Sequence, residues 1–106
     1  MNSFIWMSYD LGVSGDYEGL YAWLDNYEAK ECGNSVACFW FSHEGDMLTS
    51  LKDEIEGAVS LNKRARVYVI YTDNEGMRGR FIIGGRKGAP WYGFGMREAD
   101  SDDQAF

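Results

Sequence analysis

Three segments of this chain are apolar on both faces of a strand, and this pattern constrains the fold more than any other. They are Phe4–Met7, Val36–Phe41 and Val67–Ile70. A strand with one face in water alternates apolar and polar residues, so continuous apolar runs predict strands that are covered on both faces. The chain has 106 residues, which is room for a single domain. A single small domain must therefore bury both faces of its sheet.

The spacing of apolar residues and turn signals predicts two helices between these strands. Tyr17, Leu20, Tyr21, Leu24 and Tyr27 lie on one helical face, and so do Leu48, Leu51, Ile55 and Val59. Ser14 or Asp16 is expected to cap the first helix, and Asp46 the second, which ends near Ser60. The strands are predicted at 3–9, 29–32, 35–41, 66–72 and 80–84, with a hairpin turn at Gly33-Asn34 and a turn at 73–76.

The element order is βαββαβ with an added strand, which predicts a ferredoxin-like α+β fold. Such a fold has an antiparallel sheet with two helices on one face. Residues 1–96 are expected to form this single domain, and residues 97–106 an acidic, flexible tail. The two helices leave the second apolar face open. We expect a symmetric homodimer that associates sheet against sheet or strand edge against strand edge. The alternative is that Trp91, Tyr92 and Phe94 fold back over the open face within a monomer.

Charge is unevenly distributed along the chain, whose formal net charge is -7. Residues 1–62 carry eleven acidic residues against two basic ones, whereas residues 63–97 carry eight basic residues against two acidic ones. The acidic total argues against a surface that attracts nucleic acid everywhere, and it leaves room for a local positive patch. The expected patch combines cations for phosphates with aromatic rings for bases. Its members are Lys63, Arg64, Arg66, Arg78, Arg80, Arg86, Lys87, Trp91, Tyr92 and Phe94.

The same patch has a second interpretation, in which it pairs with the acidic half of the chain or binds a protein. The partner is therefore expected to be RNA, DNA or a protein. Cys32 and Cys38 lack the doubled spacing of a zinc site and are not predicted to be cross-strand partners, so we expect two reduced thiols in a cytoplasmic protein. No apolar run reaches membrane-spanning length, so we expect neither a membrane span nor a signal peptide. His43, the single histidine, lies in a polar loop and is expected to be structural.

Short motifs in the first two thirds of the chain resemble a known family. They are Tyr9-Asp10 at the end of the first strand, Cys32–Val36 at the hairpin and Ala65–Ile70 in a later strand. These motifs resemble the small CRISPR-associated Cas-two proteins and their VapD-like and SinR-like relatives. The resemblance covers roughly residues 3–71 and implies a ferredoxin-like homodimer. It also implies a role for Asp10, which matches the aspartate that holds a divalent metal at the dimer interface in that family.

Asp10 is thus the candidate catalytic and metal-binding residue, with Mg²⁺ or Mn²⁺ as its cation. The competing interpretation is that Asp10 only caps the turn at Gly12–Gly15. Three functions follow from the sequence. The first is a homodimeric binding or assembly module, associated with nucleic acid or a protein. The second is a Mg²⁺-dependent endonuclease that uses Asp10. The third is an acidic mimic that occupies a nucleic-acid-binding protein.

Overall fold

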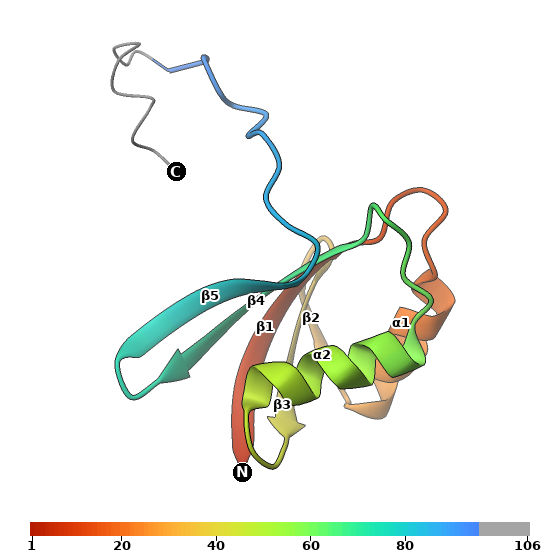
Figure 1. The fold of residues 1–106 in the computed structure, drawn as a ribbon, viewed down its shortest axis with the longest axis vertical. Coiled ribbons are helices and arrows are strands. Elements are labelled where there is room, and N and C mark those ends of the chain that lie inside the picture. The colour runs from red at the N-terminus through yellow and green to blue at the C-terminus, as the bar shows by residue number, and fades with distance from the viewer. Residues whose placement is uncertain (96–106) are drawn as a thin grey trace.

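The computed structural model describes residues 1–95 and has an α+β fold. Five strands form one antiparallel sheet in the order β2-β3-β1-β4-β5, and two helices accompany it (Figure 1). This architecture is consistent with a ferredoxin-like class. The elements are β1 Asn2–Asp10, α1 Tyr17–Asn26, β2 Lys30–Gly33, β3 Val36–Ser42, α2 Met47–Ala58, β4 Arg66–Asp73 and β5 Gly76–Ile83.

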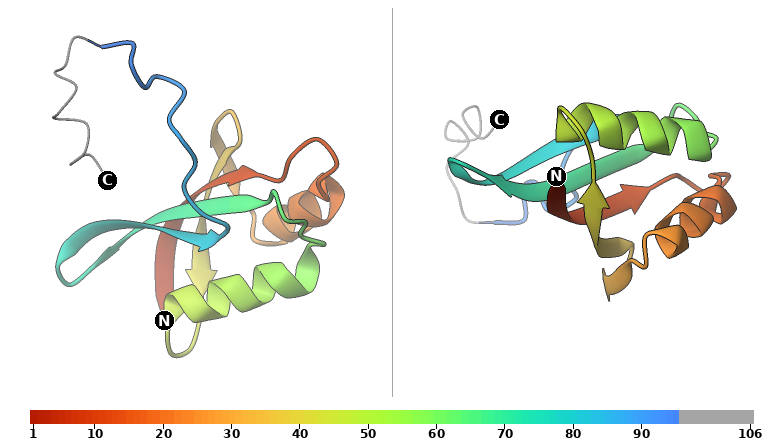
Figure 2. Two further views of the ribbon diagram at one scale, coloured as in Figure 1. Left: turned by 45° about the horizontal axis from the view of Figure 1, so that its top comes forward. Right: turned by 90° about the horizontal axis from the view of Figure 1, so that it is seen from below.

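The core lies between the helices and one face of the sheet. Ile5 and Met7 of β1 and Val67 and Val69 of β4 are fully buried on this face. Leu51 and Ile55 of α2, as predicted, are also fully buried. Figure 2 shows the two helices beside the curved sheet in two further views. The remaining core residues are Leu11, Leu20, Trp23, Leu24, Ala37, Phe39, Phe41, Val59, Ala65, Tyr71, Ile82 and Ile83.

Helix α1 begins and packs largely as its sequence predicts. Asp16 caps it, because its carboxylate accepts hydrogen bonds from Gly19 N and Ser60 N at 2.9 Å each. One carboxylate thus joins the start of α1 to the segment after α2. The buried face is rotated from the predicted one: Trp23 is 7% exposed and packs on Phe39, whereas Tyr21 is 52% exposed. The indole fits over the sheet because its ring meets Phe39 edge-on.

The β2–β3 hairpin differs from the sequence expectation. Its turn lies at residues 34–35, one residue later than predicted, and Ser35 takes a positive φ of 59°. Lys30 pairs with Cys38, and an irregularity between Glu31 and Gly33 shifts the register. Such a bulge adds a residue to one strand and moves its neighbours across the pair.

The two cysteines are joined in a disulfide, with 6.4 Å between the Cα atoms of Cys32 and Cys38. The prediction of two reduced thiols was therefore wrong. It assumed that Cys38 pairs with Ala29, a register without the bulge. In the observed register Cys38 pairs with Lys30, and Cys32, two residues further along β2, lies diagonally across from Cys38.

The second face of the sheet is not covered by the C-terminal aromatic residues. Trp91, Tyr92 and Phe94 are 69%, 57% and 86% exposed, and the segment after β5 leads away from the sheet (Figure 1). The alternative in which these residues fold back over the face was therefore wrong. The predicted domain end at residue 96 and the tail at 97–106 lie outside the described residues. Within residues 1–95, neither helix is long and apolar enough to cross a membrane.

Candidate nucleic-acid interface

The end of the sheet where β1 finishes and β4 starts brings together residues far apart in sequence. The antiparallel register places Asp10 directly opposite Arg66. Arg66 Nη2 lies 3.4 Å from Asp10 Oδ2. The Nε of Arg66 is buried and has no hydrogen-bond partner among the described residues. Within the described residues, the hydrogen-bonding capacity of the Arg66 guanidinium is therefore only partly used.

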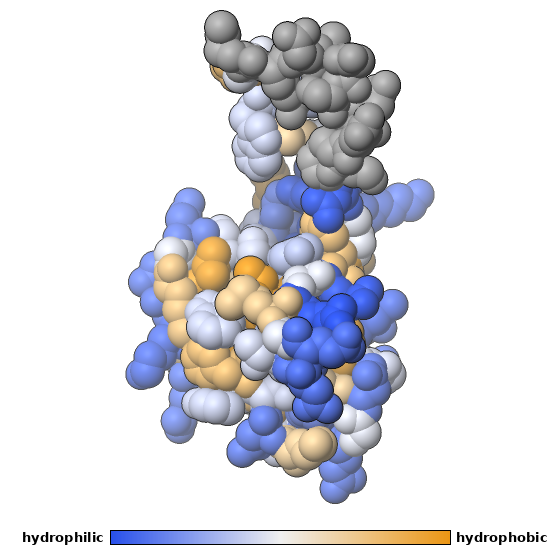
Figure 3. All heavy atoms as spheres, turned by 90° about the vertical axis from the view of Figure 1, so that its left-hand side faces the viewer, coloured by the Kyte–Doolittle hydropathy of each residue, from blue (hydrophilic) through white to orange (hydrophobic). Residues whose placement is uncertain are grey.

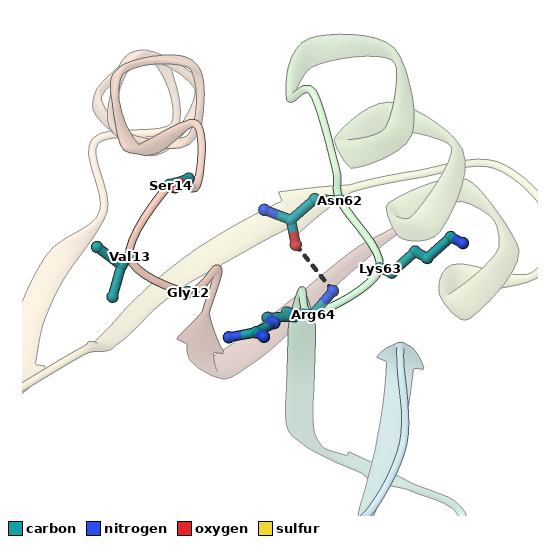
Figure 4. Close-up of a pocket in the computed structure, with 6 residues that line it drawn as sticks. All are labelled: Gly12, Val13, Ser14, Asn62, Lys63 and Arg64. Carbon is teal, nitrogen blue, oxygen red and sulfur yellow. Dashed lines mark hydrogen bonds between the residues drawn. The ribbon is translucent and has the colours of Figure 1, made fainter.

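The loop between α2 and β4 carries two further cations, Lys63 and Arg64, to this end. Its shape is fixed by Asn62, whose side-chain amide donates to Leu11 O at 3.2 Å and accepts from Arg64 N at 2.8 Å. Figure 4 shows this second hydrogen bond and the side chains of Lys63 and Arg64 extending in opposite directions. Arg64 reaches toward the loop at Gly12, where it lines a hollow of about 390 Å³. Asn62 therefore connects the two loops beside the sheet end.

The segment after β5 adds Arg86 and Lys87. It turns at Gly84, which has a φ of +69°. A Cβ there would collide with Ala65 O, so glycine allows the segment to pass against the start of β4. Lys63, Arg64, Arg66, Arg86 and Lys87 line one hollow of about 390 Å³. We call these five residues the basic end.

Two further hollows connect the basic end to the sheet. One, of about 300 Å³, is lined by Ser8, Asp10, Arg66, Tyr68, Phe81 and Arg86. The other, of about 480 Å³, is lined by Arg66, Phe81 and residues 86–91, including Trp91. Arg66, Phe81 and Arg86 line both hollows, so the two are adjacent. Among all the described residues that line these hollows, Asp10 alone has a carboxylate.

The Asp10 carboxylate interacts with groups of its own chain. Its Oδ1 accepts a 3.0 Å hydrogen bond from Gly12 N. This bond, followed by the hydrogen bond and charge of Arg66, lowers the pKa of the Asp10 carboxyl below its usual value. No group of three or more metal-binding side chains exists within residues 1–95. A divalent cation prefers several oxygen ligands, so the described residues of one chain do not by themselves fit the expected Mg²⁺ or Mn²⁺.

Two of the predicted basic residues lie elsewhere on the molecule. Arg78 is near the opposite end of β5, where it forms ion pairs with Asp73 at 2.8 Å and Glu75 at 3.0 Å. Arg80 pairs with Val69 in the sheet register, on the opposite side of the sheet from Tyr68 and Phe81. Tyr92 is exposed in the C-terminal segment, next to Trp91. The structure thus brings together one part of the predicted patch and not the other.

The uncovered face of the sheet carries aromatic residues that the sequence analysis did not assign to a site. Phe4, Trp6 and Trp40 form one cluster: ring centroids are 4.8 Å apart for Phe4 and Trp6, and 5.0 Å for Phe4 and Trp40. Tyr68 and Phe81 form a second contact at 4.8 Å. Figure 3, seen from the side of the β4–β5 hairpin, shows hydrophobic residues at the surface beside a hydrophilic area. The sequence feature that indicates these aromatic residues is the apolar character of both faces of the strands.

His43 has the structural role expected of it. Its ring nitrogens lie 2.9 Å from Ser3 Oγ and 3.2 Å from Gly45 O, and the ring stacks on Phe41. It lies at the start of β1, away from Asp10 at the end of that strand. General acid–base chemistry at the basic end therefore has no imidazole among the described residues.

Comparison of the chain with protein-family models, curated proteins and solved structures finds no match.

Proposed function

We propose that this protein is a ferredoxin-like nucleic-acid-binding module that holds phosphate groups at the basic end. The observation that carries the proposal is that five cationic side chains line one hollow. In the adjacent hollows Asp10 is the one carboxylate among the described lining residues. The five cations come from three segments: the α2–β4 loop, the start of β4 and the chain after β5. Cationic side chains concentrated on one part of a surface are the electrostatic signature of phosphate binding. Arg66 suits this role, because a guanidinium donates in a geometry that matches phosphate.

The overall acidity of the chain is compatible with this function. At physiological salt, charges more than about 8 Å apart are largely screened, so a polyanion responds mainly to the local patch. The acidic remainder of the surface repels a polyanion that approaches anywhere other than the basic end. This repulsion orients the ligand. The strand order, with β5 added beside β4, supports the ferredoxin-like assignment. The resemblance of residues 3–71 to the Cas-two, VapD-like and SinR-like group also supports a role with nucleic acid.

The salt dependence of oligonucleotide binding tests the proposal. Anisotropy of a labelled 20-nucleotide strand is measured for the parent, for Lys63→Gln/Lys87→Gln, and for Lys52→Gln as the matched control. Lys52 is exposed on α2, outside the basic end. The logarithm of the binding constant falls as the logarithm of the salt concentration rises. Each lost phosphate contact makes this slope less steep by about 0.7 for single strands. We expect a weaker slope for the double variant only, and equal slopes for all three proteins would refute the proposal.

A metal-dependent nuclease at Asp10 is the second candidate, favoured by the match of Tyr9-Asp10 to the family motif. It requires a second copy, since Asp10 is the one carboxylate that the described residues place at this end of the sheet. Cleavage of RNA and DNA is measured with Mg²⁺, Mn²⁺ or EDTA for the parent and Asp10→Asn. Metal-dependent cleavage that Asp10→Asn loses would establish this candidate. The expected homodimer stays a prediction, and sedimentation velocity at micromolar concentration tests it.

A further inference from the structure

We infer that the uncovered face of the sheet is a stacking platform for the bases of single-stranded nucleic acid. The inference rests on the proposed function, because it extends a strand from the basic end onto the sheet. It assigns a ligand class to residues outside the basic end. We call the residues on this face the platform; they are Phe4, Trp6, Trp40, Tyr68 and Phe81.

The sheet register arranges the platform in rows that begin at the basic end. The first row pairs Asp10 with Arg66. The second places Tyr68 between Ser8 of β1 and Phe81 of β5. The third places Trp6 between Cys38 and Ile70, and the fourth pairs Phe4 with Trp40. Successive rows are two residues apart, which is about 7 Å along a strand. From Asp10 to Phe4 the platform therefore extends about 20 Å.

The platform is accessible and its rings are held in place. Trp40 is 63% exposed and Trp6 is 37% exposed. The Phe4 ring meets the rings of both tryptophans edge-on, at interplanar angles of 83° and 65°. These edge-on contacts fix the orientation of the indoles while leaving surface to solvent. Tyr68 is fixed in another way, because its ring covers Gly79, where an added Cβ would collide with it.

Charge favours a strand of nucleic acid over a second copy of the chain as the occupant. At the side-chain positions of this face in β1, β3, β4 and β5, the described residues include Asp10 as the one carboxylate, and Arg66 neutralises it. The rows run directly into the hollow that Arg66, Phe81, Arg86 and Lys87 line. Rings for bases beside cations for phosphates are the combination by which sheet surfaces bind single strands. A second copy docked through the same face would bring the same cations and, among the described residues of these four strands, only the Asp10 carboxylate that Arg66 already neutralises.

The experiment compares three labelled 20-nucleotide probes at one salt concentration: a mixed single strand, the same strand with abasic sites throughout, and a duplex. The proteins are the parent, Trp40→Ala, Trp40→Phe, and Tyr21→Ala as the control. Tyr21 is an exposed aromatic residue on α1, on the helix side of the molecule. Loss of one base–aromatic stack weakens binding about fivefold or more. We expect that loss for Trp40→Ala with the mixed single strand, and near-parent affinity for Trp40→Phe and Tyr21→Ala.

The probes separate failure of the platform from failure of the basic end. We expect the parent to bind the abasic strand and the duplex more weakly than the mixed strand. Equal affinity for mixed and abasic strands, with the Lys63→Gln/Lys87→Gln effect intact, would overturn the platform and leave the proposed function standing. If neither Trp40→Ala nor Lys63→Gln/Lys87→Gln changes binding, both the platform and the proposed function are overturned. If sedimentation shows a dimer that Trp40→Ala dissociates without changing affinity for the strand, the face is a self-association surface and the inference is wrong.

Discussion

Trp40 of β3 lies directly opposite Phe4 of β1, and the two ring centroids are 5.0 Å apart. The pair belongs to the two neighbouring strands in the middle of the sheet. In most antiparallel sheets one face is buried and the other is polar. Here the middle strands bury Ile5 and Phe39 on one face and expose Trp40 on the other. Exposed aromatic clusters are typical of interaction sites, and this exposure is the basis of our inference that the face binds a ligand.

The two tryptophans on opposite faces of the sheet should differ strongly in their contribution to stability. Trp23 is 7% exposed and Trp40 is 63% exposed. We expect Trp23→Ala to lower the free energy of unfolding by about 3–5 kcal/mol, the range for a buried aromatic. For Trp40→Ala we expect about 1–2 kcal/mol, because a smaller part of this side chain is removed from water. Urea titration measures both, and similar losses would mean that Trp40 is covered in solution.

Gly79 should control the position of the Tyr68 ring. Gly79→Ala places a Cβ where the ring lies, so the ring must move away from β5. Because Tyr68 is only partly buried, we expect a loss of about 1 kcal/mol, at the low end of overpacking. The affinity of Gly79→Ala for single-stranded nucleic acid should also fall. Gly57→Ala is the control, since no atom lies within 4 Å of its added Cβ. Unchanged affinity for Gly79→Ala would exclude Tyr68 from the platform.

Tyr27 should make stability depend on pH at the alkaline end. Burial, then the 2.6 Å hydrogen bond to Glu54 Oε1 and the charge of Glu54, raise the pKa of Tyr27 to about 12. The unfolded phenol ionises near pH 10, so alkali favours the unfolded chain. The contribution of the neutral phenol is complete below about pH 10 and is lost as the pH rises to about 12.

Denaturant titrations across this pH range measure the effect. Tyr27→Phe should flatten the alkaline loss of stability. The control Tyr68→Phe, which removes a phenol on the other face of the sheet, should not. If Tyr27→Phe and the parent lose stability in parallel between pH 10 and 12, the Glu54 contact does not govern the phenol.

The disulfide should contribute modestly to stability, because it closes a short loop. Cys32 and Cys38 are six residues apart, for which the chain-entropy relation gives about 2 kcal/mol. Dithiothreitol should lower the free energy of unfolding of the parent by that amount. It should have no effect on Cys32→Ser/Cys38→Ser. Two free thiols in a titration of the untreated, denatured protein would contradict the disulfide.

The sequence predicts much of the fold because its signals are local. Asp16 and Asp46 cap their helices as expected, since a cap depends on the next few residues. Strand positions were predicted within a few residues, except that β5 begins at Gly76 rather than at Arg80. Hydrogen bonds to β4 along the whole hairpin extend this strand through Arg78, which local propensity does not reveal.

The candidate site could be predicted only in part. Composition indicated a basic patch. It could not separate Arg66 and Arg86, which line the same hollow, from Arg78, which is paired with Asp73. Contacts between segments 20 residues apart depend on register and on the turn at Gly84. The cysteines make the same point, because a bulge of one residue decided whether the two sulfur atoms meet.

Most of the helices and strands, the helix caps and the apolar character of both strand faces follow from local sequence. These features depend on backbone preferences and side-chain spacing within a few residues of one another. The face of the sheet that stays open and the cations that gather at its end follow from the tertiary fold. Those outcomes depend on strand order and register, which place residues such as Asp10 and Arg66 in contact across 56 positions of the chain.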